Sequence, residues 1–181
     1  MESACTLEAL RESILKGVDR KLTTEEIEAM LSGIVFEEGD YLGYVLETPE
    51  TYYRNSIARS QFAELLVMTW LPGQASPIHD HAGSNCGIRV LEGRLTETFY
   101  QAAESETNVA VKVAEDVWGP GMITSAAVET VHKVTNAERG ERLVSLHLYS
   151  PPLRLDAMKI YDEGFDSEIE TGLVLSPAGG V

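Results

Sequence analysis

The hydrophobic positions near the start of the chain repeat with the period of an α-helix. Between residues 6 and 18, apolar side chains recur at intervals of three and four, and charged side chains fill the positions between them. Thr23, followed three residues later by Glu26, has the pattern of a capping box, and Gly33 follows the short apolar stretch after it. The sequence therefore predicts two short helices before about residue 33.

From about residue 56 the pattern changes to short runs of aliphatic, β-branched and aromatic residues, separated by Gly, Pro, Asn and acidic residues. The runs that we expect to form strands are 63–71, 86–91, 95–100, 109–113, 122–125 and 143–149. Gly93-Arg94 lies between two of these runs and predicts a hairpin turn. The pattern is typical of a mainly β protein, an antiparallel barrel or sandwich with short N-terminal helices.

Length and composition fit one domain. The 181 residues are 44% hydrophobic, which is enough for one core of ordinary size, and no Pro- or Ser-rich linker divides the sequence. We expect a single domain over 1–181, with a helical part over about 1–50 and a β-barrel over about 51–175.

The acidic composition excludes two classes of partner. Against 14 basic residues stand 29 acidic ones, and the formal net charge of −15 repels nucleic acid and anionic membrane surfaces. The sequence shows neither the pattern of a signal peptide nor an apolar run of membrane-spanning length. Two cysteines, Cys5 and Cys86, are too few for a disulfide framework. We expect a cytoplasmic monomer that binds neither nucleic acid nor membrane.

All four histidines lie within the predicted β region, and two of them are separated by a single residue. Because side chains alternate along an extended segment, His79 and His81 point the same way while Asp80 points away from them. Such a pair can bind one metal ion through two imidazoles. The alternative is a surface loop in which the two histidines occur by chance.

The residues around the pair resemble the two sequence motifs of the cupin superfamily, whose fold is a jelly-roll β-barrel. The first motif is matched at Gly73, His79, His81, Cys86 and Gly93, although a glutamate usually stands at the position of Cys86. The second is matched at Gly119, Gly121, His132 and Asn136. We therefore expect a metal bound by His79, His81 and His132. Three imidazoles leave positions open for a substrate and dioxygen, but they accept zinc, copper, iron and nickel alike.

Three polar residues share one face of the last predicted strand. Ser145, His147 and Tyr149 occupy alternate positions, opposite the aliphatic residues between them. A buried polar face needs hydrogen-bond partners. The three side chains either satisfy one another within the core or contribute to a site.

Two strings resemble the cysteine dioxygenase family, and the resemblance runs from about residue 52 to residue 152. They are Ser76-Pro-Ile-His-Asp-His81 followed by Cys86, and Val144-Ser-Leu-His-Leu-Tyr-Ser-Pro-Pro152. The resemblance implies that the three histidines hold Fe(II). It also implies that both atoms of dioxygen are transferred to the thiol of L-cysteine, which gives cysteine sulfinic acid.

The same resemblance implies roles for six further residues. Ser145, His147 and Tyr149 would form a relay beside the iron, and the sulfur of Cys86 can become bonded to the Tyr149 ring. Arg54, with Tyr52, would bind the substrate carboxylate through its planar guanidinium. Without the resemblance, Cys86 is equally well explained as a small buried apolar residue, and Arg54 as one partner of a surface salt bridge.

Two alternative functions remain open from the sequence. The first is oxidation of another small thiol, such as 3-mercaptopropionate, although an arginine at position 54 favours cysteine. The second is a cupin that binds a metal without catalysis, since one fold hosts both behaviours. The polar strand around His147 argues against the second.

Overall fold

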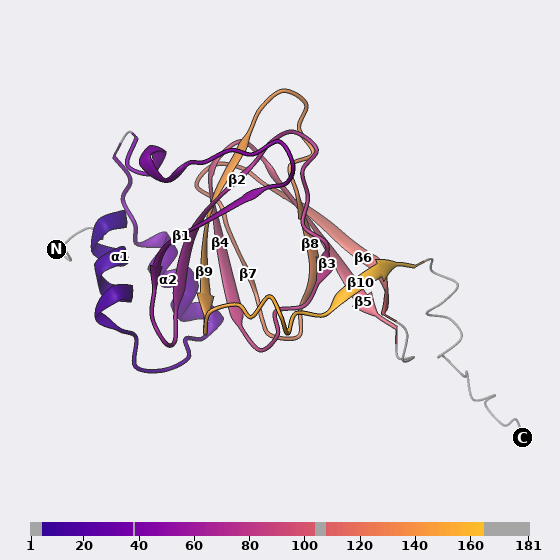
Figure 1. Ribbon diagram of the computed structural model, residues 1–181, viewed down its shortest axis with the longest axis horizontal. Coiled ribbons are helices and arrows are strands. Elements are labelled where there is room, and N and C mark those ends of the chain that lie inside the picture. Colours follow the sequence, from indigo (N-terminus) through magenta and orange to yellow (C-terminus); the bar gives the residue numbers. More distant parts are fainter. Residues whose placement is uncertain (1–4, 38, 104–107, 165–181) are drawn as a thin grey trace, which may run out of the picture.

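The structure, a computed structural model, describes residues 5–37, 39–103 and 108–164. The described residues form two facing β-sheets, and helices cover the outer surface of one sheet (Figure 1). The first sheet has the spatial order β1 (Tyr53–Arg59), β2 (Glu64–Trp70), β9 (Leu143–Ser150), β4 (Asn85–Glu92) and β7 (Ile123–Ala126). The second has the order β10 (Ile160–Glu163), β3 (Ile78–His79), β8 (Val131–Thr135), β5 (Leu95–Ala102) and β6 (Val109–Trp118). It closes on itself because β10 also pairs with β6. The predicted mainly β, barrel-type fold is confirmed.

Both predicted helices are present. Helix α1 (Leu7–Lys16) begins after Thr6, whose side chain accepts a hydrogen bond from the Ala9 backbone N–H. It ends two residues earlier than the pattern predicts, because Gly17 adopts a φ of 104° that breaks the helix. Helix α2 (Thr24–Ser32) begins with the predicted capping box, in which both reciprocal hydrogen bonds are formed. A short 3₁₀ helix, η1 (Leu42–Tyr44), follows.

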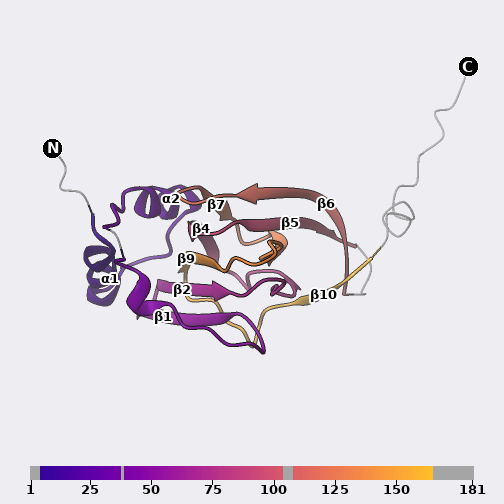
Figure 2. The same ribbon diagram turned by 90° about the horizontal axis from the view of Figure 1, so that it is seen from above.

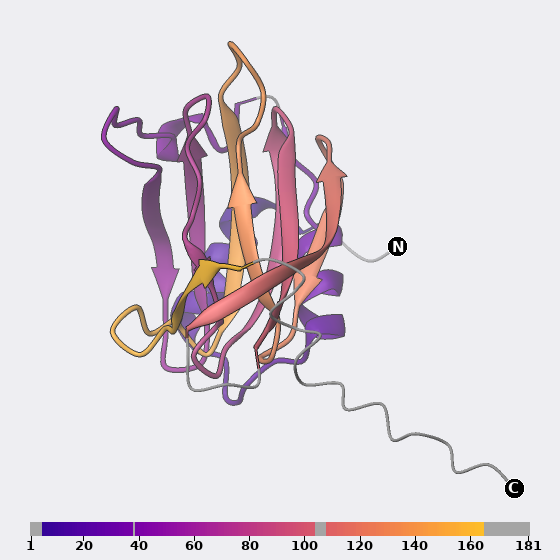
Figure 3. The same cartoon turned by 90° about the vertical axis from the view of Figure 1, so that its right-hand side faces the viewer.

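The central strands of the first sheet are buried on both faces. On β9, the side chains of Val144, Leu146 and Leu148 belong to the core under the helices, whereas Tyr149 belongs to the core inside the barrel. The side chains of β2 likewise alternate between the core under the helices and the core inside the barrel. Figure 2 shows the helices on the outer side of this sheet, and Figure 3 shows them behind both sheets. The alternation of side chains therefore separates the polar face of β9 from its aliphatic face, as expected, and the structure directs the polar face into the barrel.

Strands β1, β3, β8 and β10 are not among the predicted runs, and other details also differ from the expectations. Gly93-Arg94 does not turn a hairpin, because β4 and β5 belong to different sheets and the turn leads the chain from one to the other. Strand β6 extends to Trp118, beyond the predicted end at residue 113, because pairing with β5 continues through an exposed acidic stretch. Strand β3 ends at His79, so His81 lies in the following loop.

The predicted end of the barrel at residue 175 lies outside the described residues. The assignment of the whole chain to one domain stays a prediction. Neither helix in the described ranges is long and apolar enough to cross a membrane.

Candidate active site

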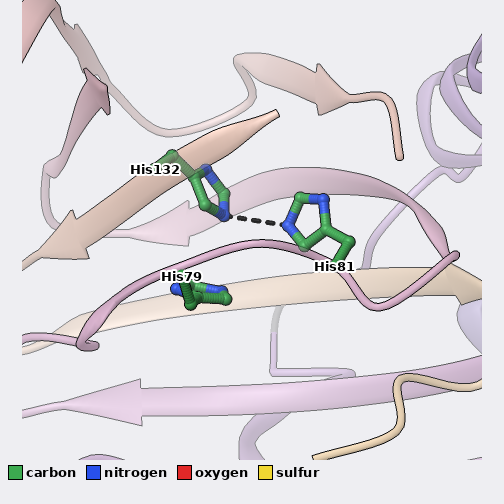
Figure 4. A group of neighbouring side chains, drawn as sticks. All are labelled: His79, His81 and His132. Atoms are coloured by element: carbon green, nitrogen blue, oxygen red, sulfur yellow. Dashed lines mark hydrogen bonds between the residues drawn. The ribbon is translucent and has the colours of Figure 1, made fainter. Parts of the chain in front are cut away.

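The three histidines predicted to bind a metal meet inside the barrel. His79 ends β3, His132 lies in β8 directly opposite His79 in the strand pairing, and His81 follows β3 in a loop. Their candidate ligand atoms all lie within 4.8 Å of one another. The three side chains are almost completely buried. Figure 4 shows the His81 and His132 rings facing each other, with the His79 ring beside them.

The hydrogen bonds of the three rings orient their free nitrogens. Each Nδ1 contacts an oxygen: the Pro77 carbonyl at 2.9 Å, the Ala127 carbonyl at 3.3 Å and the Glu97 carboxylate at 2.6 Å. Carbonyls only accept hydrogen bonds, so Nδ1 of His79 and His81 carries the proton, and an ionised Glu97 requires the same of His132. Each Nε2 then carries a lone pair. The Nε2 atoms of His81 and His132 lie 3.0 Å apart (Figure 4). Two facing lone pairs repel each other unless a cation lies between them, so this arrangement fits a metal ion.

The protonation states of the rings also fit a metal. Burial, and then the proximity of His132, lower the pKa of His79 to about 4 and that of His81 to about 3. Burial lowers the pKa of His132 to about 4. All three imidazoles are therefore neutral at neutral pH, which is the form that binds metals.

Glu97 is a site residue that the sequence reasoning missed. It lies on β5, is fully buried, and accepts hydrogen bonds from His132 Nδ1 and, at 2.8 Å, from the Thr124 hydroxyl. Burial raises the pKa of Glu97, and its contacts with Thr124 and Trp118 oppose this change. A signal was present in the sequence: Glu97 stands two residues after Leu95, so a carboxylate shares the inward face of a predicted strand.

The polar residues of β9 form part of a hydrogen-bonded chain. The Trp70 indole N–H donates to the Ser145 hydroxyl at 3.0 Å, and that hydroxyl lies 2.9 Å from His147 Nε2. The serine hydroxyl accepts from Trp70, and the tautomer of His147 sets whether the hydroxyl donates to Nε2 or accepts from it. Within the described residues, Nδ1 has no hydrogen-bond partner. The His147 and Tyr149 rings stack with centroids 6.1 Å apart, so these two side chains meet through their ring faces.

Arg54 and Tyr52 border the same pocket as the polar strand. The pocket is lined by Tyr52, Arg54, Met68, Trp70, Ser76, His79, Ile88, His132, Val134, His147 and Tyr149. The Arg54 guanidinium carbon lies 5.6 Å from the centroid of the Tyr149 ring, and Tyr52 stacks on Trp70 at 4.2 Å. Arg54 forms no salt bridge with a carboxylate of the described residues. This cation therefore remains available for an anionic ligand in the pocket.

Cys86 and Tyr149 are direct partners across β4 and β9, and both side chains lie in the barrel core. Burial raises the pKa of the Cys86 thiol to about 12, although a hydrogen bond with Tyr149 opposes the change. Burial also raises the pKa of the Tyr149 hydroxyl. Both groups are protonated at neutral pH, and the pairing holds sulfur and ring on one face of the sheet.

Comparison with known proteins identifies the family to which this barrel belongs. The family model for cysteine dioxygenase type I matches residues 2–164. The chain belongs to the cysteine dioxygenase family. The family's chemistry makes it an oxidoreductase, and the buried three-histidine group indicates a metal cofactor.

Relatives and solved structures agree with this family. Cysteine dioxygenase type 1 of Homo sapiens is 29% identical over 145 residues, which cover 79% of this chain and 72% of the relative. The Rattus norvegicus enzyme is 28% identical over the same lengths. A Klebsiella pneumoniae protein with a double-stranded β-helix domain superposes with a TM-score of 0.52. At 17% identity, with 71% of this chain and 96% of that one covered, it supports the fold alone.

Proposed function

We propose that this enzyme oxidises the thiol of free L-cysteine to cysteine sulfinic acid, with dioxygen as oxidant and Fe(II) held by His79, His81 and His132. The observation that carries the proposal is the convergence of the three histidines beside a pocket that also contains Arg54, an arginine without a salt bridge among the described residues. Bound Fe(II) would supply coordination positions for the substrate thiolate and for dioxygen. The family to which the chain belongs supports this choice of metal and substrate.

Arg54 and Tyr52 would bind the carboxylate of cysteine. A guanidinium presents two parallel N–H donors to a carboxylate and so fixes both the distance and the orientation of the substrate. The stacking of Tyr52 on Trp70 limits the movement of that side of the pocket. Held in this way, the substrate would present its sulfur to the histidine cluster.

Tyr149 would donate a hydrogen bond within the pocket. Since burial raises the pKa of its hydroxyl, Tyr149 keeps its proton at neutral pH and acts as a donor. Ser145 and His147 would position it from behind, because Trp70 anchors Ser145 and the His147 ring stacks on Tyr149. We also propose that Cys86 can form a thioether with the Tyr149 ring, in which the S–H and a ring C–H lose two hydrogens to dioxygen as the oxidant; their cross-strand pairing supports this bond.

Oxygen uptake by reconstituted protein tests the proposal. The metal-free protein is loaded anaerobically with Fe(II), Zn(II) or Co(II), and dioxygen consumption is followed with L-cysteine and with 3-mercaptopropionate. We expect uptake with Fe(II) and cysteine, none with Zn(II), and none with the His79→Ala variant. Uptake with 3-mercaptopropionate alone would support the metal site but contradict cysteine as the substrate. No uptake with either thiol would contradict the catalytic proposal.

A further inference from the structure

The three-histidine cluster differs from many iron sites because none of its ligand side chains is negatively charged. Three neutral imidazoles leave the full charge of a divalent cation uncompensated in a buried site. Of the three Nδ1 anchors, two are neutral backbone carbonyls, and the third is the carboxylate of Glu97. The only charged anchor therefore acts on His132.

The surroundings of Glu97 also fit a cation held nearby. The side chain has no solvent exposure, and among the described residues it contacts no charged partner, because the His132 ring beside it is neutral. The other contacts are neutral: Thr124 donates a hydrogen bond, and the buried Trp118 indole N–H is nearby but falls short of hydrogen-bond geometry. An ionised carboxylate is costly to bury among neutral groups alone. A metal bound to Nε2, on the opposite side of the His132 ring, would supply the compensating charge.

We propose that Glu97 is a positioning residue for the metal, which holds His132 with Nε2 toward the ion and provides the negative charge that the three imidazoles lack. This inference rests on the ligand set in the proposed function. Glu97 orients the ring because a carboxylate accepts only from a protonated Nδ1, which leaves the lone pair on Nε2. It adds charge without occupying a coordination position, so the positions for thiol and dioxygen stay open.

Metal affinity of the Glu97→Gln variant tests the inference. Glutamine keeps the size of the side chain and one accepting oxygen but removes the charge. A matched control is Glu64→Gln, which removes another buried carboxylate, one that contacts Ser56 and Arg59 rather than a histidine. Metal-free proteins are titrated with Co(II) in competition with a chelator, and the reduction potential of the iron-loaded proteins is measured. The thermal midpoints of the metal-free proteins check folding.

We expect Glu97→Gln to bind Co(II) about 10- to 100-fold more weakly, with a more positive iron potential, and Glu64→Gln to match the wild type. Affinity and potential unchanged in Glu97→Gln would overturn the inference. The His79→Ala variant separates this failure from failure of the ligand set, because it loses Co(II) binding if the three histidines hold the metal. Retention of Co(II) by His79→Ala would instead overturn the proposed ligands.

If Glu97→Gln does not fold, the wild-type protein still provides a test. In the Zn(II)-loaded form with ¹⁵N-labelled histidine, NMR reports which ring nitrogen of His132 carries the proton. We expect a protonated Nδ1 whose proton resonates further downfield than those of His79 and His81, since only it binds a carboxylate. A His132 ring protonated on Nε2, or an Nδ1 proton like those of the other two, would overturn the inference.

Discussion

Replacement of Arg54 by lysine should selectively weaken the use of substrates that carry a carboxylate. Arg54 lines the pocket, lies over the Tyr149 ring and pairs with no carboxylate of the described residues. A lysine keeps the charge but cannot form two parallel hydrogen bonds. Hydrogen bonds to charged groups contribute about 1.5–3 kcal/mol. At about 1.36 kcal/mol per factor of ten, kcat/KM for cysteine should fall about 10- to 150-fold.

The assay compares two substrates across the same variants. Cysteine and cysteamine differ only in the carboxylate, so kcat/KM is measured for both with the wild type, Arg54→Lys and Arg54→Ala. If Arg54 binds the carboxylate, each variant loses activity on cysteine and little on cysteamine. The matched control is Arg59→Lys on the same strand, where the exposed Arg59 pairs with Glu64 and should be insensitive. Iron content is measured throughout and should not change.

Equal losses on both substrates would refute this reasoning. That result would mean that Arg54 supports the pocket or the Tyr149 ring rather than the substrate carboxylate. Loss of iron from Arg54→Lys would refute it as well, because among the described residues the guanidinium forms no hydrogen bond with the histidine cluster.

Five further predictions concern the metal, the relay, pH, the cross-link and packing. His132→Ala should lose bound iron, whereas His147→Ala should keep its iron and lose turnover. Both variants are tested by measuring iron content and kcat, and the reverse pattern would contradict the two roles. The free energy of unfolding of the metal-free protein should fall as the pH is lowered from about 6.5 to 4. The unfolded chain binds protons near the ordinary histidine pKa, while the folded cluster stays neutral. Urea titrations that show no loss of stability over this range would contradict this prediction. A Cys86–Tyr149 thioether should lower the intact mass by two hydrogens, and a stoichiometric free thiol at Cys86 would exclude it. Gly87→Ala should destabilise by about 1–3 kcal/mol in urea titrations, since a Cβ there overlaps Ile27 of α2; unchanged stability would show that the helix adjusts freely.

The sequence predicts those features that depend on local pattern. Hydrophobic positions at intervals of three and four locate α1 and α2, and short runs of β-forming residues locate most strands. The alternation of side chains places His147 and Tyr149 on the same face of β9. The turn at Gly93 was misjudged because a tight turn that joins two sheets has the same local composition as a hairpin.

The remaining site features depend on contacts between distant segments. Glu97 and His132 are 35 positions apart and meet only because β5 pairs with β8. The Trp70 N–H donates a hydrogen bond to Ser145 on the neighbouring strand, a contact that neither local pattern indicates. Strand pairing brings such partners together, and the periodicity of one sequence does not reveal which strands pair.

Labelled dioxygen gives the most direct test of the central claim. The Fe(II)-loaded protein is supplied with L-cysteine under ¹⁸O₂, and the product is analysed by mass spectrometry. We predict cysteine sulfinic acid that carries two ¹⁸O atoms, with one dioxygen consumed for each molecule formed. A product with one labelled oxygen, or cystine as the only product, would contradict dioxygenation of the thiol at the three-histidine site.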